Sequence, residues 1–174
     1  MLSLKGEQIY LRALEPKDLD FLYDLENNPE IWEISGTTSP YSKHVLQLYL
    51  ENAHKDIYEV KQLRLCICNL KGVVLGLIDL FDFDPKNLRV GMGIIVSQKI
   101  NRNKGVGAEA VEILTNYAFS VLGMRQVYVN VLEENAPSIH LFSKLGFVKV
   151  GIKKDWIYSN GAFKNEILFQ KINS

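Results

Sequence analysis

The alternation of apolar and polar residues along the first third of the chain predicts one strand followed by two helices. Alternating apolar positions over residues 8–14 are typical of a strand, and apolar residues at helical spacing indicate helices over 15–28 and 42–55. Residues 28–42, between these helices, are rich in residues that break regular structure and are expected to form a loop.

The middle of the chain has three apolar runs separated by turn sequences. They predict a meander of strands over residues 62–70, 73–83 and 88–96. Gly91 and Gly93 lie inside the third strand, where glycine often marks a bulge or a close backbone approach.

The last third of the chain alternates between helical and strand-like patterns. The clearest helical periodicity is expected to give a helix that ends near Gly123, and a shorter helix is expected to begin at an Asn135 cap. The predicted elements are helix 105–123, strand 126–132, helix 135–146 and a hairpin of strands 147–158 and 163–172. The chain of 174 residues therefore reads as one domain of mixed α/β (α+β) class, in the order β-α-α-β-β-β-α-β-α-β-β.

Charge narrows the range of partners. Twenty basic residues balance twenty acidic ones, so no overall charge recruits nucleic acid or an anionic membrane. Charged residues stand early in the chain, and no run approaches the ~20 apolar residues of a membrane span. We therefore expect a soluble, cytoplasmic protein without a nucleic-acid or membrane partner.

Cysteine and histidine are too sparse to indicate a metal site. Cys66 and Cys68 are two residues apart on a predicted strand, so their side chains should share one face. A zinc site needs about four converging ligands, and the three histidines are scattered. We expect two reduced thiols that serve as small strand residues, and no metal.

The sequence NRNKGVG, residues 101–107, lies where a predicted strand passes into the clearest helix. The first N–H groups of a helix lack intrahelical partners, and glycines let the backbone wrap around an anion. Arg102 and Lys104 add positive charge. The pattern favours a pyrophosphate site, but a glycine turn with solvated basic residues remains an alternative. It matches neither the nucleotide P-loop nor the dinucleotide fingerprint.

Residues 102–107 fit R-x-x-G-x-G, which resembles the acetyl-coenzyme A signature of the GNAT N-acetyltransferases. Residues 135–147, NAPSIHLFSKLGF, resemble the second conserved region of that family, and the order of elements agrees along nearly the whole chain. The resemblance implies one acetyltransferase domain over 1–174. It implies a mostly antiparallel central sheet, flanked by helices and splayed between the fourth and fifth strands. The spermidine/diamine and ribosomal-protein N-terminal acetyltransferases form the branch it resembles most.

The same resemblance implies a set of residues for the acetyl-CoA cosubstrate. The backbone of the strand before the motif would pair with the pantetheine arm, and the motif's amides would bind the pyrophosphate. Asn135 matches a family position that often contacts the cofactor, besides being suited to cap a helix. The implied residues are Ile94, Ile95, Val96, Arg102, Asn103, Lys104, Gly105, Val106, Gly107 and Asn135.

The proton-transfer residues are harder to assign. Acetyl transfer to an amine needs removal of a proton from the amine and a proton for the leaving thiolate. Many family members have a tyrosine where this chain has Phe142, and many have a glutamate in the region of Gly91 and Gly93. Tyr128, Tyr158, Ser138 or water remain candidates for the acid, and the base is open.

Carboxylates occur one strand earlier, where Asp79 and Asp82 each interrupt an apolar run. Strict alternation places Phe83 on the face of Asp79, and Asp84 is expected to open a turn. A buried carboxylate without a partner is costly, so each aspartate lies either on a solvated edge or in a wet cleft that binds a cation. The segment GLIDLFDFD also resembles the corresponding strand of polyamine acetyltransferases, which carries glutamates there. Asp79 and Asp82 are therefore candidates for both catalysis and substrate binding. Tyr128 is a further candidate for catalysis.

The segment EIWEISGTTSPY resembles the substrate-side loop of the same branch. By this resemblance Glu30, Trp32 and Glu33 line an amine pocket, although simple core packing is an equal reading of Trp32. We expect an N-acetyltransferase acting on a small polycationic amine such as spermidine or a diamine. An N-terminal protein acetyltransferase and a silent coenzyme A-binding module are the alternatives. A homodimer or higher homo-oligomer is compatible with each.

Overall fold

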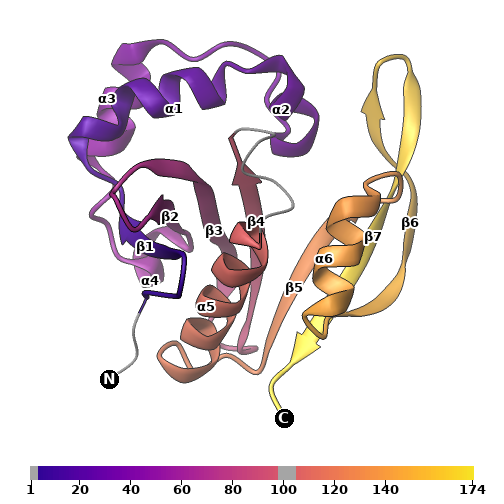
Figure 1. Cartoon of the computed structure of the whole chain (residues 1–174). Coiled ribbons are helices and arrows are strands. Elements are labelled where there is room, and N and C mark those ends of the chain that lie inside the picture. Colours follow the sequence, from indigo (N-terminus) through magenta and orange to yellow (C-terminus); the bar gives the residue numbers. More distant parts are fainter. Residues whose placement is uncertain (1–3, 98–104) are drawn as a thin grey trace.

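The computed structural model describes residues 4–97 and 105–174, and these form a seven-stranded sheet in the order β1-β2-β3-β4-β5-β7-β6 (Figure 1). All neighbouring strands are antiparallel except β4 and β5, which are parallel. The predicted mixed, mostly antiparallel sheet is thereby confirmed. The strands are β1 (Ile9–Ala13), β2 (Leu63–Asn69), β3 (Val74–Asp84), β4 (Arg89–Val96), β5 (Gln126–Leu132), β6 (Val148–Ser159) and β7 (Ala162–Ile172).

Helices cover both faces of the sheet. On one face, α1 and α3 pack Leu22 and Leu46 into a cluster with Cys66 and Cys68. On the other face, α5 buries residues such as Leu114 in the larger cluster. None of the helices in the described ranges is long and apolar enough to cross a membrane. The helices are η1 (Pro16–Asp18), α1 (Leu19–Glu26), α2 (Pro29–Ser35), α3 (Lys43–Glu51), α4 (Ile57–Val60), α5 (Val106–Ser120) and α6 (Ala136–Lys144).

Residues 28–42 are not a continuous loop, because α2 forms within them. Asn28 caps this helix by accepting a hydrogen bond from the Glu30 amide at 3.0 Å, and Pro29 occupies its first position. Gly36 ends it in the left-handed region, with φ 73°. The prediction was wrong because the same asparagine, proline and glycine that break other structures also start and stop a short helix. The short α4 was also not predicted.

The alternation of β3 breaks at Asp82. The register with β4 shifts between Phe81 and Asp84, and Asp82 has a positive φ of 49°. This bulge adds a residue, so Phe83 turns into the cluster that contains Leu80 and is 3% exposed. The prediction that Phe83 shares a face with Asp79 was therefore wrong.

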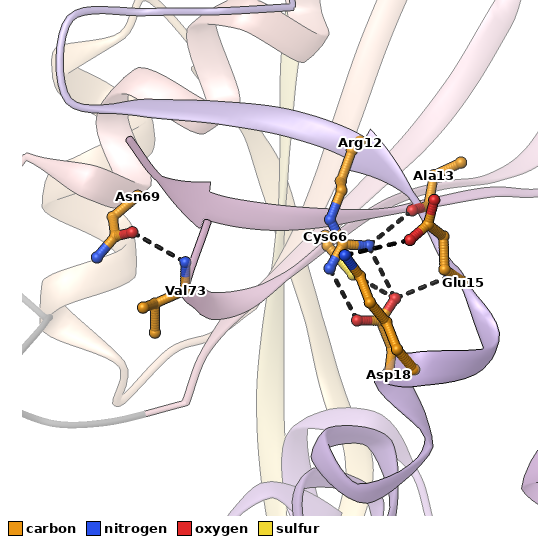
Figure 2. Close-up of polar contacts among 8 residues, drawn as sticks. Arg12, Ala13, Glu15, Asp18, Cys66, Asn69 and Val73 are labelled. Carbon is orange, nitrogen blue, oxygen red and sulfur yellow. Dashed lines mark hydrogen bonds and ion pairs between the residues drawn. The ribbon is translucent and has the colours of Figure 1, made fainter. Parts of the chain in front are cut away.

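A buried ion pair fastens the start of the helical layer to the sheet (Figure 2). Both terminal nitrogens of Arg12 on β1 donate to Asp18 of η1 at 2.8 Å, and the Glu15 amide donates to the same carboxylate at 2.8 Å. The Cys66 thiol donates at 3.6 Å. Burial raises the pKa of Cys66 to about 12, so it is a protonated core residue. Cys66 and Cys68 are free and buried on one face of the sheet, as predicted.

Beyond their first three residue pairs, β4 and β5 separate. The parallel pairing runs from Arg89 opposite Gln126 to Gly91 opposite Tyr128. Figure 1 shows β4 continuing towards α2 while β5 follows α6 and β7. This confirms the predicted splay and opens the space in which the candidate site lies.

Candidate active site

Two adjoining cavities occupy the splay. The β4–α5 groove, of about 560 Å³, is bounded by the end of β4, the start of α5, and α6. The β4–β5 cavity, of about 290 Å³, lies between the separating strands and is covered by α2. Ile34, Ile94, Asn135 and Ser138 line both, so the two spaces adjoin each other.

The start of α5 lies at one end of the groove. Gly105 is the N-cap residue, with φ 79°, and as a glycine it has no side chain of its own to cap the helix. The first helical N–H groups therefore have no intrahelical partner and carry partial positive charge. A Cβ at Gly107 would lie 3.7 Å from Leu141 Cδ2 and 3.8 Å from Ile94 Cδ1, so its absence widens the groove. This end fits an anionic group. Arg102, Asn103 and Lys104 lie outside the described residues.

The end of β4 lies along the same groove. Ile94, Ile95 and Val96 line it and are half-buried. Pairing with β5 stops at Gly91, and these residues of β4 beyond it line the groove. Such an edge suits an extended ligand that carries amide groups.

Helix α6 forms the opposite wall. Asn135 Oδ1 accepts a hydrogen bond from the Ser138 amide at 3.2 Å, which confirms its predicted role as a helix cap. Sequence reasoning missed His140 and Lys144, which line the groove together with Leu141. These residues recur at intervals of three to four, so the helical spacing of residues 137–144 contained the signal.

Helix α2 bridges the β4–β5 cavity. Glu33 lines the cavity, and its carboxylate accepts a hydrogen bond from Lys164 of β7, which also donates to Glu134 at 2.5 Å. The Lys164 contact lowers the pKa of Glu33. Glu30 is exposed and lines the groove. Trp32 belongs to neither lining, because its indole N–H donates to the carbonyl of Glu26 in α1 at 2.8 Å.

The position of the family tyrosine is an apolar wall. Phe142 lines the cavity, is 4% exposed and packs edge-on against Phe147 at 5.2 Å between ring centroids. Of the residues considered as proton donors, Ser138 lines both spaces. Tyr158 is 67% exposed on the hairpin. Tyr128 is half-buried outside both linings, and desolvation raises the pKa of its phenol.

The two β3 aspartates have different surroundings. Asp79 is half-buried between its register partners Arg64 on β2 and Gly93 on β4. Desolvation raises the pKa of Asp79, although the charge of Arg64 opposes this. Asp82 is exposed on the bulge, outside both linings. The structure therefore brings Asp79, but not Asp82, to the border of the cavity at Gly93.

The sequence profile of the acetyltransferase (GNAT) domain matches residues 8–148. The chain belongs to the GNAT acetyltransferase family. The Escherichia coli K12 spermidine N(1)-acetyltransferase is 29% identical over 162 residues, 93% of this chain and 84% of that protein. A Vibrio cholerae spermidine N(1)-acetyltransferase is 27% identical over 160 residues, 92% of this chain and 90% of that protein.

A solved structure has the same fold. The spermidine N-acetyltransferase from Vibrio cholerae, in complex with CoA and spermine, superposes with a TM-score of 0.86 over 96% of both chains at 24% identity. Its membership of the GNAT family, shown by the sequence profile, makes this protein an acyltransferase, and the family uses acetyl-CoA as the acetyl donor.

Proposed function

We propose that this GNAT protein acetylates a primary amine of a small polycationic molecule such as spermidine or a diamine. The observation that carries the proposal is that two unlike spaces lie side by side and share part of their walls. The groove ends at the first amides of α5, and it shares Ile94, Asn135 and Ser138 with the carboxylate-bearing cavity. The spermidine acetyltransferases among its relatives agree with this substrate class.

The groove fits acetyl-CoA, which supplies an activated thioester. The α5 amides at Val106 and Gly107, with the charges of Arg102 and Lys104, would hold the diphosphate. The β4 edge at residues 94–96 would pair with the amides of the pantetheine arm. Asn103, Gly105 and Asn135 complete the residues proposed for the donor.

The β4–β5 cavity fits the acceptor. Glu33 and Glu166 line it, and each is paired with a lysine of the C-terminal hairpin: Lys164 with Glu33, and Lys153 with Glu166 at 2.7 Å. A polyamine carries several ammonium groups and could exchange with these lysines, whereas a neutral amine could not. Helix α2, β4, β5 and α6 wall the space on different sides, which favours a small acceptor over an extended polypeptide.

The remaining candidates for substrate binding fall into two groups, inside and outside the proposed site. We place Glu30 at the mouth of the groove and Asp79 at the border of the cavity, both within reach of a cationic acceptor. Asp82, exposed on the bulge, and Trp32, hydrogen-bonded to α1, stay outside the proposed site.

An acetylation screen tests this function. Free thiol released from acetyl-CoA is measured with spermidine, spermine, a diamine, a monoamine and an N-terminal peptide, and products are identified by mass spectrometry. Polyamines or diamines should turn over fastest. Turnover of the peptide with inert polyamines would support the N-terminal alternative. Calorimetric CoA binding without turnover of any amine would support a silent module, which the apolar Phe142 favours.

The donor groove has its own test. Gly105→Asp adds a negative charge beside the α5 amides and forces a non-glycine residue into a backbone with φ 79°. We expect CoA binding, measured by calorimetry, to weaken at least tenfold, and an unchanged affinity would count against the groove.

A further inference from the structure

Two glycines of β4 leave space that side chains of β3 fill. A Cβ on Gly91 would lie 2.3 Å from the ring of Phe81, and a Cβ on Gly93 would lie 3.0 Å from Asp79 Oδ1. These are the cross-strand pairs Phe81–Gly91 and Asp79–Gly93 of one face. Asp79 and Phe81 therefore lie across β4 where any other residue would place its own side chain.

The two side chains reach β4 at different points of the splay. Phe81 lies over the last residue of β4 that pairs with β5, and its ring contacts Tyr128 edge-on, with 6.0 Å between centroids. Asp79 lies two residues further along, over Gly93, where β5 no longer pairs. Gly93 lines the β4–β5 cavity beside Ile94, so the carboxylate borders the space proposed for the acceptor, next to the donor groove.

The groups around Asp79 come from three other elements. Arg64 of β2 and a hydrogen bond from Gln62 favour its charged form, whereas Glu26 of α1 disfavours it. Tyr49 of α3 lies against the Arg64 guanidinium, 5.9 Å from ring centroid to Cζ. Arg64 is held by Glu26, with Nη1 to Oε1 at 2.8 Å. Partial burial dominates and raises the pKa of Asp79, which makes its carboxylate a stronger base than an exposed one.

We propose that Asp79 is the general base that takes the proton from the acceptor amine, and that Gly93 is the opening through which it reaches that amine. This inference rests on the proposed function. A substrate ammonium that enters the cavity over Gly93 would meet the Asp79 carboxylate beside the β4 edge that holds the thioester.

The amine loses two protons during the transfer, and the Asp79 carboxylate accepts the first of them. One proton passes from the ammonium to the Asp79 carboxylate. The nitrogen lone pair then forms the C–N bond at the thioester carbonyl carbon, and the C–S bond breaks with its electron pair going to sulfur. The second proton of the nitrogen ends on the thiolate, and Asp79 releases the first to water. An ammonium and a thioester thus give an amide, a thiol and one proton.

Asp79→Asn tests the base, with Asp24→Asn of α1 as the matched control. Asp24 is exposed and outside both linings. With spermidine, Asp79→Asn should lower kcat about a hundredfold or more at neutral pH, while CoA affinity stays unchanged. The control should keep the wild-type kcat. If the wild type acetylates spermidine and Asp79→Asn retains its kcat, the inference fails and the proposed function stands. If the wild type acetylates none of the amines, both fail.

The pH profile separates a base from a binding group. In the wild type, kcat/KM should fall as pH drops below the raised pKa of Asp79, because the base must be ionised. In Asp79→Asn this limb should disappear, and the rate should rise with pH as free amine forms, narrowing the gap to the wild type. A variant that raises KM alone, with the wild-type profile, would assign Asp79 to binding and overturn the inference.

Gly93→Ala tests the opening without changing any titratable group. Its Cβ would force the Asp79 carboxylate to move and would fill part of the cavity wall. Gly151→Ala on β6 is the control, because a Cβ there meets nothing within 4 Å. We expect Gly93→Ala to lower kcat at least tenfold with an unchanged melting temperature and Gly151→Ala to leave it unchanged. Equal kcat values in the two variants would overturn the role of Gly93.

Discussion

Two aspartates, Asp18 and Asp79, lie beside arginines on the same face of the sheet, and the pKa values of their carboxyl groups shift in opposite directions. Asp18 is 3% exposed, yet its pKa is lowered, because the Arg12 fork and the Glu15 amide overcome the desolvation. Asp79 is more exposed, yet its pKa is raised. Burial alone therefore does not set the ionisation of these groups. At Asp18 the hydrogen bonds and the charge of Arg12, with the Glu15 amide, outweigh desolvation, whereas at Asp79 desolvation outweighs the charge of Arg64 and the hydrogen bond from Gln62.

The two arginines explain the contrast. Arg12 gives both terminal nitrogens to Asp18. Arg64 gives one to Glu26 at 2.8 Å and reaches Asp79 mainly through its charge. We call the Arg12–Asp18 contact the closed pair, because the guanidinium binds both oxygens of the carboxylate. It holds η1 to β1. Around Arg64, in contrast, the pKa of Asp79 stays raised, so its carboxylate can act as a base where β4 and β5 separate.

The largest expected effect on stability is at the closed pair. Asp18→Asn removes the charge that the Arg12 guanidinium requires, and breaking a buried pair from one side should lower the free energy of unfolding by about 3 kcal/mol. Urea denaturation measures this. Asp20→Asn, at an exposed pair with Lys43, is the control and should cost less than about 0.5 kcal/mol. Equal losses in the two variants would show that the Arg12–Asp18 pair contributes no more than a surface pair.

At Asp79 the same substitution should not lower the free energy of unfolding. Because its folded pKa is raised, the folded state binds this proton more tightly than the unfolded state, and stability falls as pH rises through that interval. Asp79→Asn should therefore leave the free energy of unfolding at neutral pH unchanged or increase it by about 1 kcal/mol. For Asp18, whose pKa is lowered, stability is instead lost as pH falls through its folded value. Urea denaturation at several pH values checks both signs, and a loss of stability in Asp79→Asn would contradict the contrast.

The smallest effect concerns the thiol beside the closed pair. In Cys66→Ser the new hydroxyl can donate to Asp18 Oδ2, as the thiol does. For the Cys68 thiol no hydrogen bond is found among the described residues, so a serine hydroxyl there would lack a partner among them. Cys66→Ser should be less destabilising than Cys68→Ser by roughly 0.5–1 kcal/mol, because an unsatisfied buried hydroxyl costs more. Thermal denaturation of the two variants makes this comparison. The reverse order would show that the Asp18 contact contributes nothing.

Much of the fold was predictable from hydrophobic spacing, and the departures have local causes. Strand β5 appears over residues 126–132 as predicted, since its alternation is regular. Helix α2 was hidden because Asn28, Pro29 and Gly36 have the composition of a loop. The bulge at Asp82 has no signal in the alternation itself, which is why Phe83 was placed on the wrong face.

The candidate site was predictable where it depends on the backbone. The glycines of the α5 entry and the Asn135 cap can be recognised in the sequence and line the groove, while their binding of the cofactor stays a prediction. The tertiary contacts of the site could not be predicted from the sequence. Glu33 contacts Lys164 across the cavity, and Gly93 leaves the space that Asp79 fills. These contacts join residues far apart in the chain or on neighbouring strands, and their identity depends on register.

The most direct test of the contrast is a carboxyl ¹³C NMR titration of the aspartates, with Asp18→Asn and Asp79→Asn spectra to assign the two signals. We predict that Asp79 titrates above the ordinary aspartate range and Asp18 below it. If Asp79 titrates at or below its ordinary value, the carboxylate is no better a base than an exposed one, and its proposed part in acetyl transfer would be contradicted.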